Sequence, residues 1–291
     1  MANEGATDLS RLSAGLDALE TPTTSGPRSP HTIWTSLWPP ILAVGLLLAV
    51  WWLVVALRLQ PSYVLPGPDS VAASIIDGVA SGEIPRAIAN SLQRAFLGFA
   101  ISVLLGTLLG LSLARIGWWR RGVGPLVTGL MVLPSVAWVP AAILWFGIST
   151  PAMLFVVIMG ATPSIANGLV GGIRQIPALY TKVGYVLGAR GFAMIRFIVM
   201  PAALPGYLGG LRQGWAFAWR SLMAAELIAF SPALGLGLGQ LLNQGRELSD
   251  MSTVMATIIM ILLVGIAVEL CVFAPLERRV LRHRGLADLS S

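Results

Sequence analysis

Apolar residues along this chain fall into six long stretches separated by more polar segments. The stretches cover residues 37–57, 96–116, 123–145, 152–170, 206–228 and 253–273. A helix needs about 20 apolar residues to cross the hydrocarbon core of a bilayer. The pattern therefore predicts an all-α polytopic membrane protein with six transmembrane helices. Pro134 and Pro140 interrupt the third stretch, and we expect them to kink it or unwind a turn.

The composition agrees with a membrane protein. Of the 291 residues, 56% are hydrophobic and only 11% are charged, whereas a soluble protein carries about 25% charged residues. Residues 1–33 are rich in Ser, Thr, Pro and Gly, which predicts a disordered cytoplasmic tail. We expect the transmembrane domain over residues 34–284 and a short tail at residues 285–291.

Basic residues are distributed unevenly between the two sides of the predicted membrane. With the amino terminus placed in the cytoplasm, the inner segments hold thirteen Lys and Arg and the outer segments hold four. Because cytoplasmic loops carry the excess of basic residues, both termini are predicted to be cytoplasmic. The net charge of +6 then reflects topology, and no nucleic-acid partner is expected.

Each of the two long outer segments predicts a short helix. The first contains a turn at residues 65–70 that could cap a helix starting at Val71. The second, residues 229–252, carries Gly235, Gly237 and Gly239. We interpret it as a flexible turn leading into a surface helix.

The loop at residues 171–204 is basic and amphipathic. It carries four Arg and Lys residues and no Asp or Glu. Pro177 suits the start of a helix, and apolar residues follow with the spacing of one helical face: Leu179, Val183, Val186 and Leu187. Gly188 suits the left-handed position that ends a helix.

A second short helix is expected in this loop at residues 192–199, ended by Pro201 and Pro205. The resulting helix–glycine–helix elbow is either a docking element for a partner or an amphipathic helix that rests on lipid headgroups. The residues by themselves leave both interpretations open.

The sequence lacks the motifs of the common catalytic sites. There is no G-x-x-x-x-G-K-[ST], H-E-x-x-H or G-x-S-x-G and no pair of intramembrane aspartates. The two histidines, His31 and His283, are isolated, and no residues with the spacing of metal ligands accompany them in the sequence. We therefore expect no catalytic residue, no metal site and no nucleotide site in this chain.

Several ionisable and aromatic residues lie within the predicted spans, where such residues usually face the bundle interior or a cavity. Similar depths predict an ion pair between Arg212 and Glu269. Arg220 either faces a pathway and favours an anion or makes a structural hydrogen bond. The full set of pathway candidates is Arg220, Glu226, Trp138, Trp219 and Ser135.

The loop resembles the signature of inner-membrane permeases of binding-protein-dependent ABC importers, E-A-A-x3-G-x9-I-x-L-P. Gly188 takes the glycine position, and Ile198-Val199-Met200-Pro201 matches the end with Met for Leu. The E-A-A positions are Lys182-Val183-Gly184, so the charge of the family's Glu is reversed.

Further strings are similar to the nitrate/sulfonate/taurine branch of these permeases. They are Leu65-Pro66-x-Pro68, Ser91-Leu92-x-Arg94, Leu133-Pro134-Ser135-Val136-Ala137-Trp138-Val139-Pro140, Pro201-Ala202-Ala203-Leu204-Pro205 and Ala224-Ala225-Glu226. Their shared order extends the resemblance from about residue 65 to about residue 281.

This resemblance implies a type I ABC importer permease of the bacterial inner membrane. It implies a second permease copy, two ATPase subunits that hold ATP and Mg²⁺, and an extracytoplasmic solute-binding protein. The solute would be a sulfonate, taurine or nitrate. The residues implied in coupling to the ATPase are Tyr180, Thr181, Lys182, Val183, Gly184, Leu187, Gly188, Ala189, Ile198 and Pro201.

The main alternative is a secondary transporter driven by an ion gradient. Such a protein predicts an inverted internal repeat and acidic residues near the middle of the bilayer. The sequence shows no repeat, and the acidic residues within the spans lie toward their ends.

Overall fold

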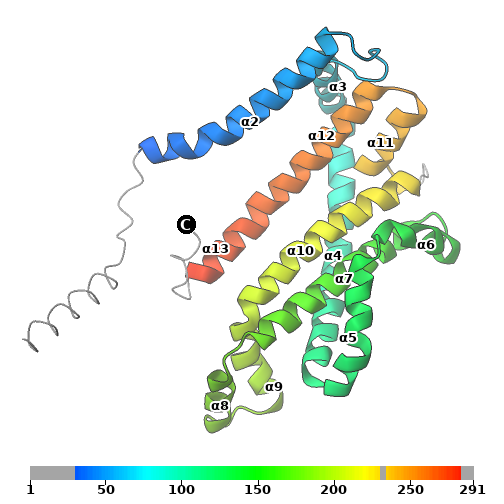
Figure 1. Cartoon of the computed structure of the whole chain (residues 1–291). Coiled ribbons are helices and arrows are strands. Elements are labelled where there is room, and N and C mark those ends of the chain that lie inside the picture. The colour runs from blue at the N-terminus through cyan, green and yellow to red at the C-terminus, as the bar shows by residue number, and fades with distance from the viewer. Residues whose placement is uncertain (1–29, 230–233, 283–291) are drawn as a thin grey trace, which may run out of the picture. The chain divides into compact units, whose positions relative to one another are not determined.

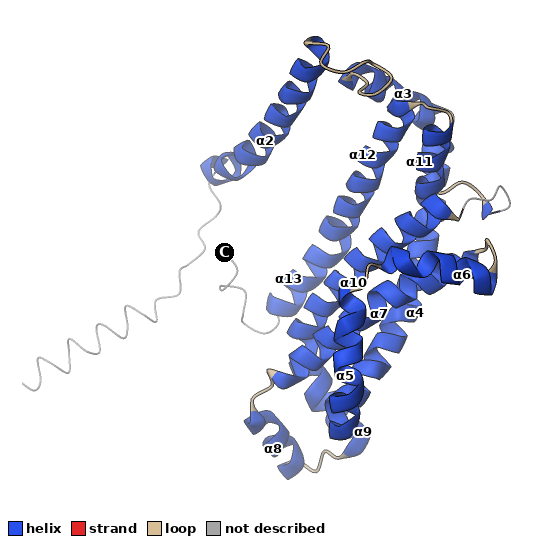
Figure 2. Ribbon diagram, turned by 45° about the vertical axis from the view of Figure 1, so that its right-hand side comes forward, coloured by secondary structure: helices blue, strands red, loops and turns tan. Residues whose placement is uncertain are grey.

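The computed structural model describes residues 30–229 and 234–282, and these residues form helices connected by loops and turns (Figure 1, Figure 2). The chain divides into two compact units, residues 1–57 and 58–291. Most of residues 1–33 and all of 285–291, the two predicted tails, lie outside the described residues.

The first unit contains one described helix, α2 (Pro30–Ala56). Its apolar part is Ile41–Ala56, which is shorter than the other candidate spans. The first predicted span is therefore helical, but over the described residues its apolar stretch is shorter than predicted.

Three long helices form the core of the second unit: α4 (Glu83–Arg115), α7 (Thr150–Arg174) and α10 (Met200–Ile228). Helix α7 packs against both of the others (Figure 1). Glycines allow the backbones of α7 and α10 to touch, because a Cβ atom added at Gly168 would lie 2.3 Å from Gly210 Cα. Close contact of this kind drives helix association in lipid.

The final span consists of α12 (Met251–Val268), the π turn η4 (Glu269–Phe273) and α13 (Ala274–Arg282). Helix α3 (Pro68–Ala80) packs against α12, in the outer segment where a helix was predicted. Helix α11 (Leu238–Glu247) packs against α10 and α12, and six of its ten residues are buried. The predicted helix is present, but it is more buried than a surface helix, because only Arg246 and Glu247 of α11 are exposed.

The third predicted span is broken. Helix α5 (Gly117–Val132) is followed by the short helix η1 (Ser135–Trp138) and by α6 (Val139–Phe146), with a bend of 100° between the two parts. Leu133 is extended, as the residue before a proline usually is. The predicted interruption is confirmed. Within the described residues, four helices are long and apolar enough to cross a membrane, or five if the bent pair is one span.

The helix after the elbow does not end at the prolines. Helix α9 (Gly191–Met194), the π turn η2 (Ile195–Val199) and α10 form one continuous helix of 38 residues. The predicted stop at Pro201 and Pro205 is wrong. Pro201 is in the first turn of α10, and the preceding π turn supplies the local adjustment that accommodates a proline in a long helix.

Candidate coupling surface and translocation pathway

The elbow begins with α8 (Ala178–Val186), which starts and ends close to the predicted positions. Gly188 has a φ of +80°. The Gly188 amide donates to the Tyr185 carbonyl at 3.0 Å, and the Ala189 amide donates to the Gly184 carbonyl at 2.9 Å. These two hydrogen bonds form a Schellman cap, so the predicted glycine stop is confirmed.

Gly184 is the one buried residue of α8. A Cβ atom at this position would lie 2.9 Å from Met194 Sδ and 3.1 Å from Ile198 Cγ1. The final E-A-A position is therefore a glycine at the place where α8 packs on the helix leading into α10.

The rest of α8 and the residue after it present an apolar surface that no other segment of residues 30–229 and 234–282 covers. The side chains of Leu179, Tyr180, Val183, Val186 and Leu187 are 46–86% exposed. Lys182 is exposed beside them, while Thr181 is half-buried and donates to the Ala178 carbonyl. Contiguous exposed apolar residues mark a site of interaction with a protein or with a membrane, so both interpretations of the elbow stay open at this point.

The other predicted coupling residues are divided between this surface and its support. Gly188 is exposed, and Ala189 and Ile198 are half-buried. Pro201 is exposed but lies on α10, beyond the π turn. Tyr185 and Val186 are strongly exposed on α8, yet the predicted set leaves both of them out.

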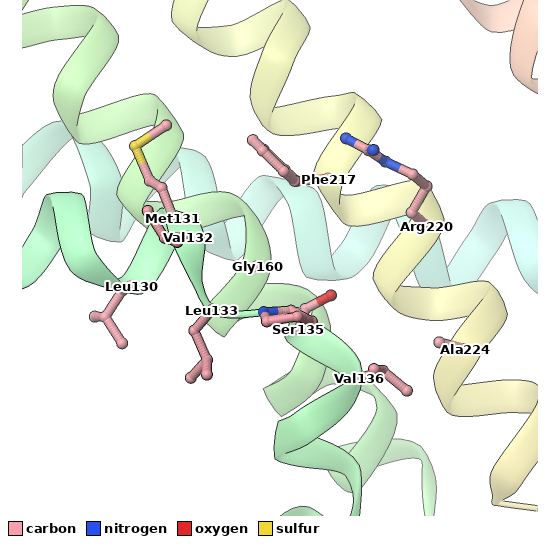
Figure 3. Close-up of a pocket in the computed structure, with 11 residues that line it drawn as sticks. Leu130, Met131, Val132, Leu133, Ser135, Val136, Gly160, Phe217, Arg220 and Ala224 are labelled. Atoms are coloured by element: carbon pink, nitrogen blue, oxygen red, sulfur yellow. The ribbon is translucent and has the colours of Figure 1, made fainter.

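A pocket of about 330 Å³ lies where α5 breaks off before η1 (Figure 3). Arg220 and Phe217 of α10 line it from one side, and residues 130–136 line it from the other. The Arg220 Nε donates to the Ala216 carbonyl at 3.2 Å, and its guanidinium carbon lies 4.8 Å from the centre of the Phe217 ring. Ala216 lies one turn earlier on the same helix, so this bond is not the predicted alternative of a hydrogen bond to a neighbouring helix. Arg220 lines the pocket, and its role in a pathway stays a prediction.

Ser135 lines the same pocket and accepts a hydrogen bond from the Ser221 hydroxyl at 2.7 Å. The Ser135 proton is left to donate elsewhere, since each hydroxyl carries one donor and two lone pairs. Gly160 of α7 also lines the pocket. A Cβ atom added at Gly160 would lie 2.3 Å from Ser221 Oγ.

Glu226, a predicted pathway candidate, lies in a buried cluster between helices. It is fully buried, and none of it lines the pocket. Both of its carboxylate oxygens are occupied. Arg94 Nη1 donates to one at 2.8 Å, and Ser91 Oγ and the Gly239 amide donate to the other at 2.8 and 3.0 Å. A carboxylate in a helix core is tolerated because it is paired and hydrogen-bonded.

The two tryptophans named as pathway candidates pack against other rings. Trp219 is 7% exposed and lies 6.3 Å from Trp215, ring centre to ring centre. Trp138 contacts Phe155 edge to face at 6.1 Å. Neither lines the pocket, because each ring is used to fill space between helices.

The buried cluster around Glu226 extends to the segment that precedes α11. Arg94 Nη2 donates to the carbonyls of Leu234 and Gly235. The Leu238 amide donates to Ser91 Oγ at 2.9 Å. The sequence prediction missed the role of Ser91 and Arg94, although both belong to a string that carries the family resemblance.

The predicted ion pair between Arg212 and Glu269 is present. Arg212 also reaches Glu277 of α13, with 3.3 Å between Nη1 and Oε2. The Arg212 side chain is 53% exposed and that of Glu269 is 30% exposed. Arg212 therefore joins α10 to both sides of the η4 turn.

Asp250 lies just before α12 and caps it. Its carboxylate accepts hydrogen bonds from the Ser252 and Thr253 amides at 3.0 and 3.2 Å and from the Thr253 hydroxyl at 2.6 Å. The hydroxyl bond is the main cause of the lowered pKa of Asp250. No group of three or more His, Cys, Asp or Glu side chains able to hold a metal occurs in residues 30–229 and 234–282.

Long apolar helices, a span broken at a pocket and an elbow with an exposed apolar face are features of a membrane transport protein of the permease class. A family model described as "Binding-protein-dependent transport system inner membrane component" matches residues 102–282. This is more than half of the chain, and the chain therefore belongs to this family.

Curated relatives agree with this assignment. The taurine transport system permease TauC of Escherichia coli is 28% identical, covering 83% of this chain and 88% of TauC. A putative aliphatic sulfonates permease, SsuC of Bacillus subtilis, is 29% identical, covering 84% and 87%. The riboflavin permease RibX of Chloroflexus aurantiacus is 31% identical, covering 85% and 90%.

A solved structure supports the fold. The MetNI methionine ABC transporter in an inward-facing conformation superposes with a TM-score of 0.52 at 19% identity, covering 67% of this chain and 94% of the solved one. The chain is therefore a multi-pass membrane permease of the ABC importer family with the type I permease fold. This membership favours an ABC permease over a secondary transporter driven by an ion gradient.

Proposed function

We propose that two copies of this chain form the pathway of an ATP-driven importer and that a separate ATPase docks on α8 of each copy. An extracytoplasmic solute-binding protein delivers the solute, and ATP and Mg²⁺ are held by the ATPase. The observation that carries this proposal is the exposed apolar face of α8, backed by the packing of Gly184 on Met194 and Ile198.

The elbow is built to transmit movement. Helix α8 rests on residues 194–198, and these continue without a break into α10. Helix α10 carries Arg220 at the pocket and Glu226 in the buried cluster. A push on α8 therefore reaches the pocket along a single continuous helix.

Lys182 indicates the charge of the ATPase surface. It lies on the exposed face of α8, and the loop at residues 171–204 contains no acidic residue. Because the Glu of the family signature is replaced by Lys, we expect an acidic or neutral surface on the ATPase opposite this position.

The docking of α8 is tested with a matched pair of substitutions. Leu187 is 75% exposed on the elbow and Leu248 is 69% exposed after α11. Leu187→Glu should abolish copurification of the ATPase and ATP-dependent uptake in vesicles, and Leu248→Glu should leave both intact. Retention of the ATPase by both variants at equal abundance would contradict the proposal.

We propose six membrane crossings, with α2 as the first and the broken α5–α6 pair as the third. Both termini and α8 then lie in the cytoplasm, as the bias of Lys and Arg indicates. In a variant with Cys271→Ser, a cysteine at position 182 should react with an impermeant maleimide only after permeabilisation. A cysteine at position 248 should react in intact cells, and the reverse labelling would refute this orientation.

We propose a small anion of the sulfonate or taurine type as the solute, with nitrate as a further candidate. Arg94 and Arg212 each pair with a carboxylate, whereas Arg220 has no ion-pair partner among the described residues. An unpaired charge within a span is costly and usually functional. Non-helical backbone at this depth occurs where it lines a cavity, and breaks in helices mark solute sites in many transporters.

The relatives named for taurine and aliphatic sulfonates agree with an anion, although another relative is named for riboflavin. Arg220→Gln should lower uptake of taurine or an alkyl sulfonate at least tenfold while the abundance of the complex stays constant. The control is Arg86→Gln, which removes the same charge from an exposed arginine of α4 that does not line the pocket. A fall in abundance of the Arg220→Gln complex would instead assign Arg220 a structural role.

A further inference from the structure

A hollow of about 380 Å³ lies at the end of the final span, away from the pathway pocket. It is formed by residues of η4 and α13. The residues that line it are Leu270, Ala274, Pro275, Arg278, Arg279 and Arg282. No residue of this hollow belongs to the pocket at the α5 break or to the elbow.

The lining changes character along the helix. Leu270, which is 63% exposed, Ala274 and Pro275 are apolar and lie at one end. Arg278, Arg279 and Arg282 follow one to three turns later and are all exposed. This order of an apolar lining followed by three guanidinium groups is complementary to a phospholipid, whose acyl chain would contact the apolar residues and whose phosphate would contact the arginines.

The acidic residue nearest to the three arginines along the described part of α13 is engaged elsewhere. Glu277 is the one acidic residue of α13, and it contacts Arg212 of α10. None of the three arginines forms an ion pair within the described part of the chain. Arg278 and Arg282 are four residues apart on one helix, where like charges repel, so an anion bound between them relieves that repulsion.

We propose that this hollow binds an anionic phospholipid, with the headgroup phosphate on Arg278, Arg279 and Arg282 and an acyl chain along Leu270. The proposal rests on the proposed placement of the final span in the bilayer. Basic clusters directly after a transmembrane helix recognise anionic headgroups. Guanidinium groups suit phosphate because they donate paired hydrogen bonds.

Lipid is favoured over free phosphate because half of the lining is apolar. Inorganic phosphate would use the arginines alone and leave Leu270, Ala274 and Pro275 uncovered. A bound lipid also holds α13 in position. Glu277 of α13 is tied to Arg212 of α10, so lipid binding stabilises the contact between the last helix and the helix that carries the pathway pocket.

The test measures lipid retention on the intact purified chain by native mass spectrometry, with phosphatidylglycerol and phosphatidylcholine as probes. Removing two arginines, Arg278→Gln with Arg279→Gln, should weaken phosphatidylglycerol retention about 25-fold, since each basic residue near an anionic surface contributes about fivefold. The control is Arg120→Gln with Arg121→Gln, which removes the same charge from two exposed arginines of α5.

Selective loss of phosphatidylglycerol in the Arg278/Arg279 variant alone supports the proposal. Equal loss in both double variants would overturn it in favour of a general charge effect. Equal retention of the two lipids by the unmodified chain would also overturn it, as would displacement of the lipid by millimolar inorganic phosphate. Because this measurement needs neither ATPase nor solute, its failure is distinct from failure of the proposed transport function.

Discussion

Two arginine–glutamate contacts join helices of this permease, and they differ in almost every physical respect. Arg94 and Glu226 are 9% and 0% exposed, and their groups make further hydrogen bonds to Ser91, Gly239 and the segment before α11. Arg212 and Glu269 are 53% and 30% exposed, and Arg212 divides its charge between Glu269 and Glu277.

The comparison shows how the environment of an ion pair sets its role. At Glu226, removing one partner leaves a charge with no water to solvate it, so the contact fixes the structure. At Arg212, an exposed pair is worth little and can exchange partners. We therefore expect the Glu226 cluster to hold α4, α10 and α11 as one body and the Arg212 contact to permit movement of α13.

The largest expected effect comes from breaking the buried pair. Glu226→Leu should destabilise the protein by about 3–5 kcal/mol, because the Arg94 charge stays buried without a partner. Thermal unfolding in detergent and the yield of folded protein measure this loss. Adding Arg94→Met should recover part of the stability, and a double variant that is less stable than Glu226→Leu would show that the charges are not the cause.

A somewhat smaller effect is expected from crowding the same cluster. A Cβ atom at Gly239 would lie 2.5 Å from Glu226 Cβ and 2.7 Å from the Met223 carbonyl oxygen. Gly239→Ala should therefore cost about 1–3 kcal/mol of unfolding free energy. Gly209→Ala on α10 is the control, since nothing lies within 4 Å of its added Cβ, and it should be neutral or slightly stabilising.

Asp250 shares one property with each of the two pairs: it is exposed, as Arg212 is, and its carboxylate accepts several hydrogen bonds, as that of Glu226 does. Substituting Asp250 therefore measures what such hydrogen bonds contribute to stability when the carboxylate is not buried. Asp250→Ala should cost about 1 kcal/mol through loss of the helix cap, as measured by thermal unfolding at pH 7. Asp250→Asn should retain most of the cap.

The pH dependence of this cap has a defined sign. The pKa of Asp250 is lowered in the folded protein from its ordinary value of 3.8. The ionised carboxylate thus contributes its extra stability above that value, and the contribution is lost as the pH falls through the lowered pKa. The stability gap between the unmodified chain and Asp250→Asn should shrink at acidic pH, and a gap that widens would contradict this assignment.

The smallest effect is expected at the exposed pair. A double-mutant cycle with Arg212→Gln and Glu269→Gln should give a coupling energy below about 1 kcal/mol, since exposed pairs are weakly coupled. Unfolding in detergent measures the four stabilities. A coupling as large as the loss at Glu226 would show that this pair is shielded from water in the assembled protein, and the contrast between the two regions would disappear.

Local features of the elbow could be predicted because each depends on residues close together in the chain. The cap at Gly188 requires a residue without a Cβ atom at positive φ, and it uses the carbonyls of Tyr185 and Gly184, only three and four residues earlier. The break of the third span follows from Pro134 and the extended residue before it. The Arg212–Glu269 pair could also be predicted, because similar depths in two neighbouring spans limit the available partners.

Features that depend on packing between distant segments were missed or misassigned. Glu226 forms its ion pair with Arg94, which is 132 residues away in the sequence. No local pattern of residues identifies that partner. The helix through Pro201 continues because the π turn before it and the packing of α10 on α7 offset the cost of a proline. Tryptophans in a span carry no signal that separates ring packing from pathway lining.

The sequence by itself therefore determined the class of protein, most of the span positions and the elbow with its glycine stop, since hydrophobicity and backbone sterics act over short distances. The tertiary structure alone decided which charges are buried together and which one lines a pocket without an ion-pair partner among the described residues. The physical reason is that the cost of a charge in a membrane depends on what surrounds it, and those surroundings come from helices far apart in the chain.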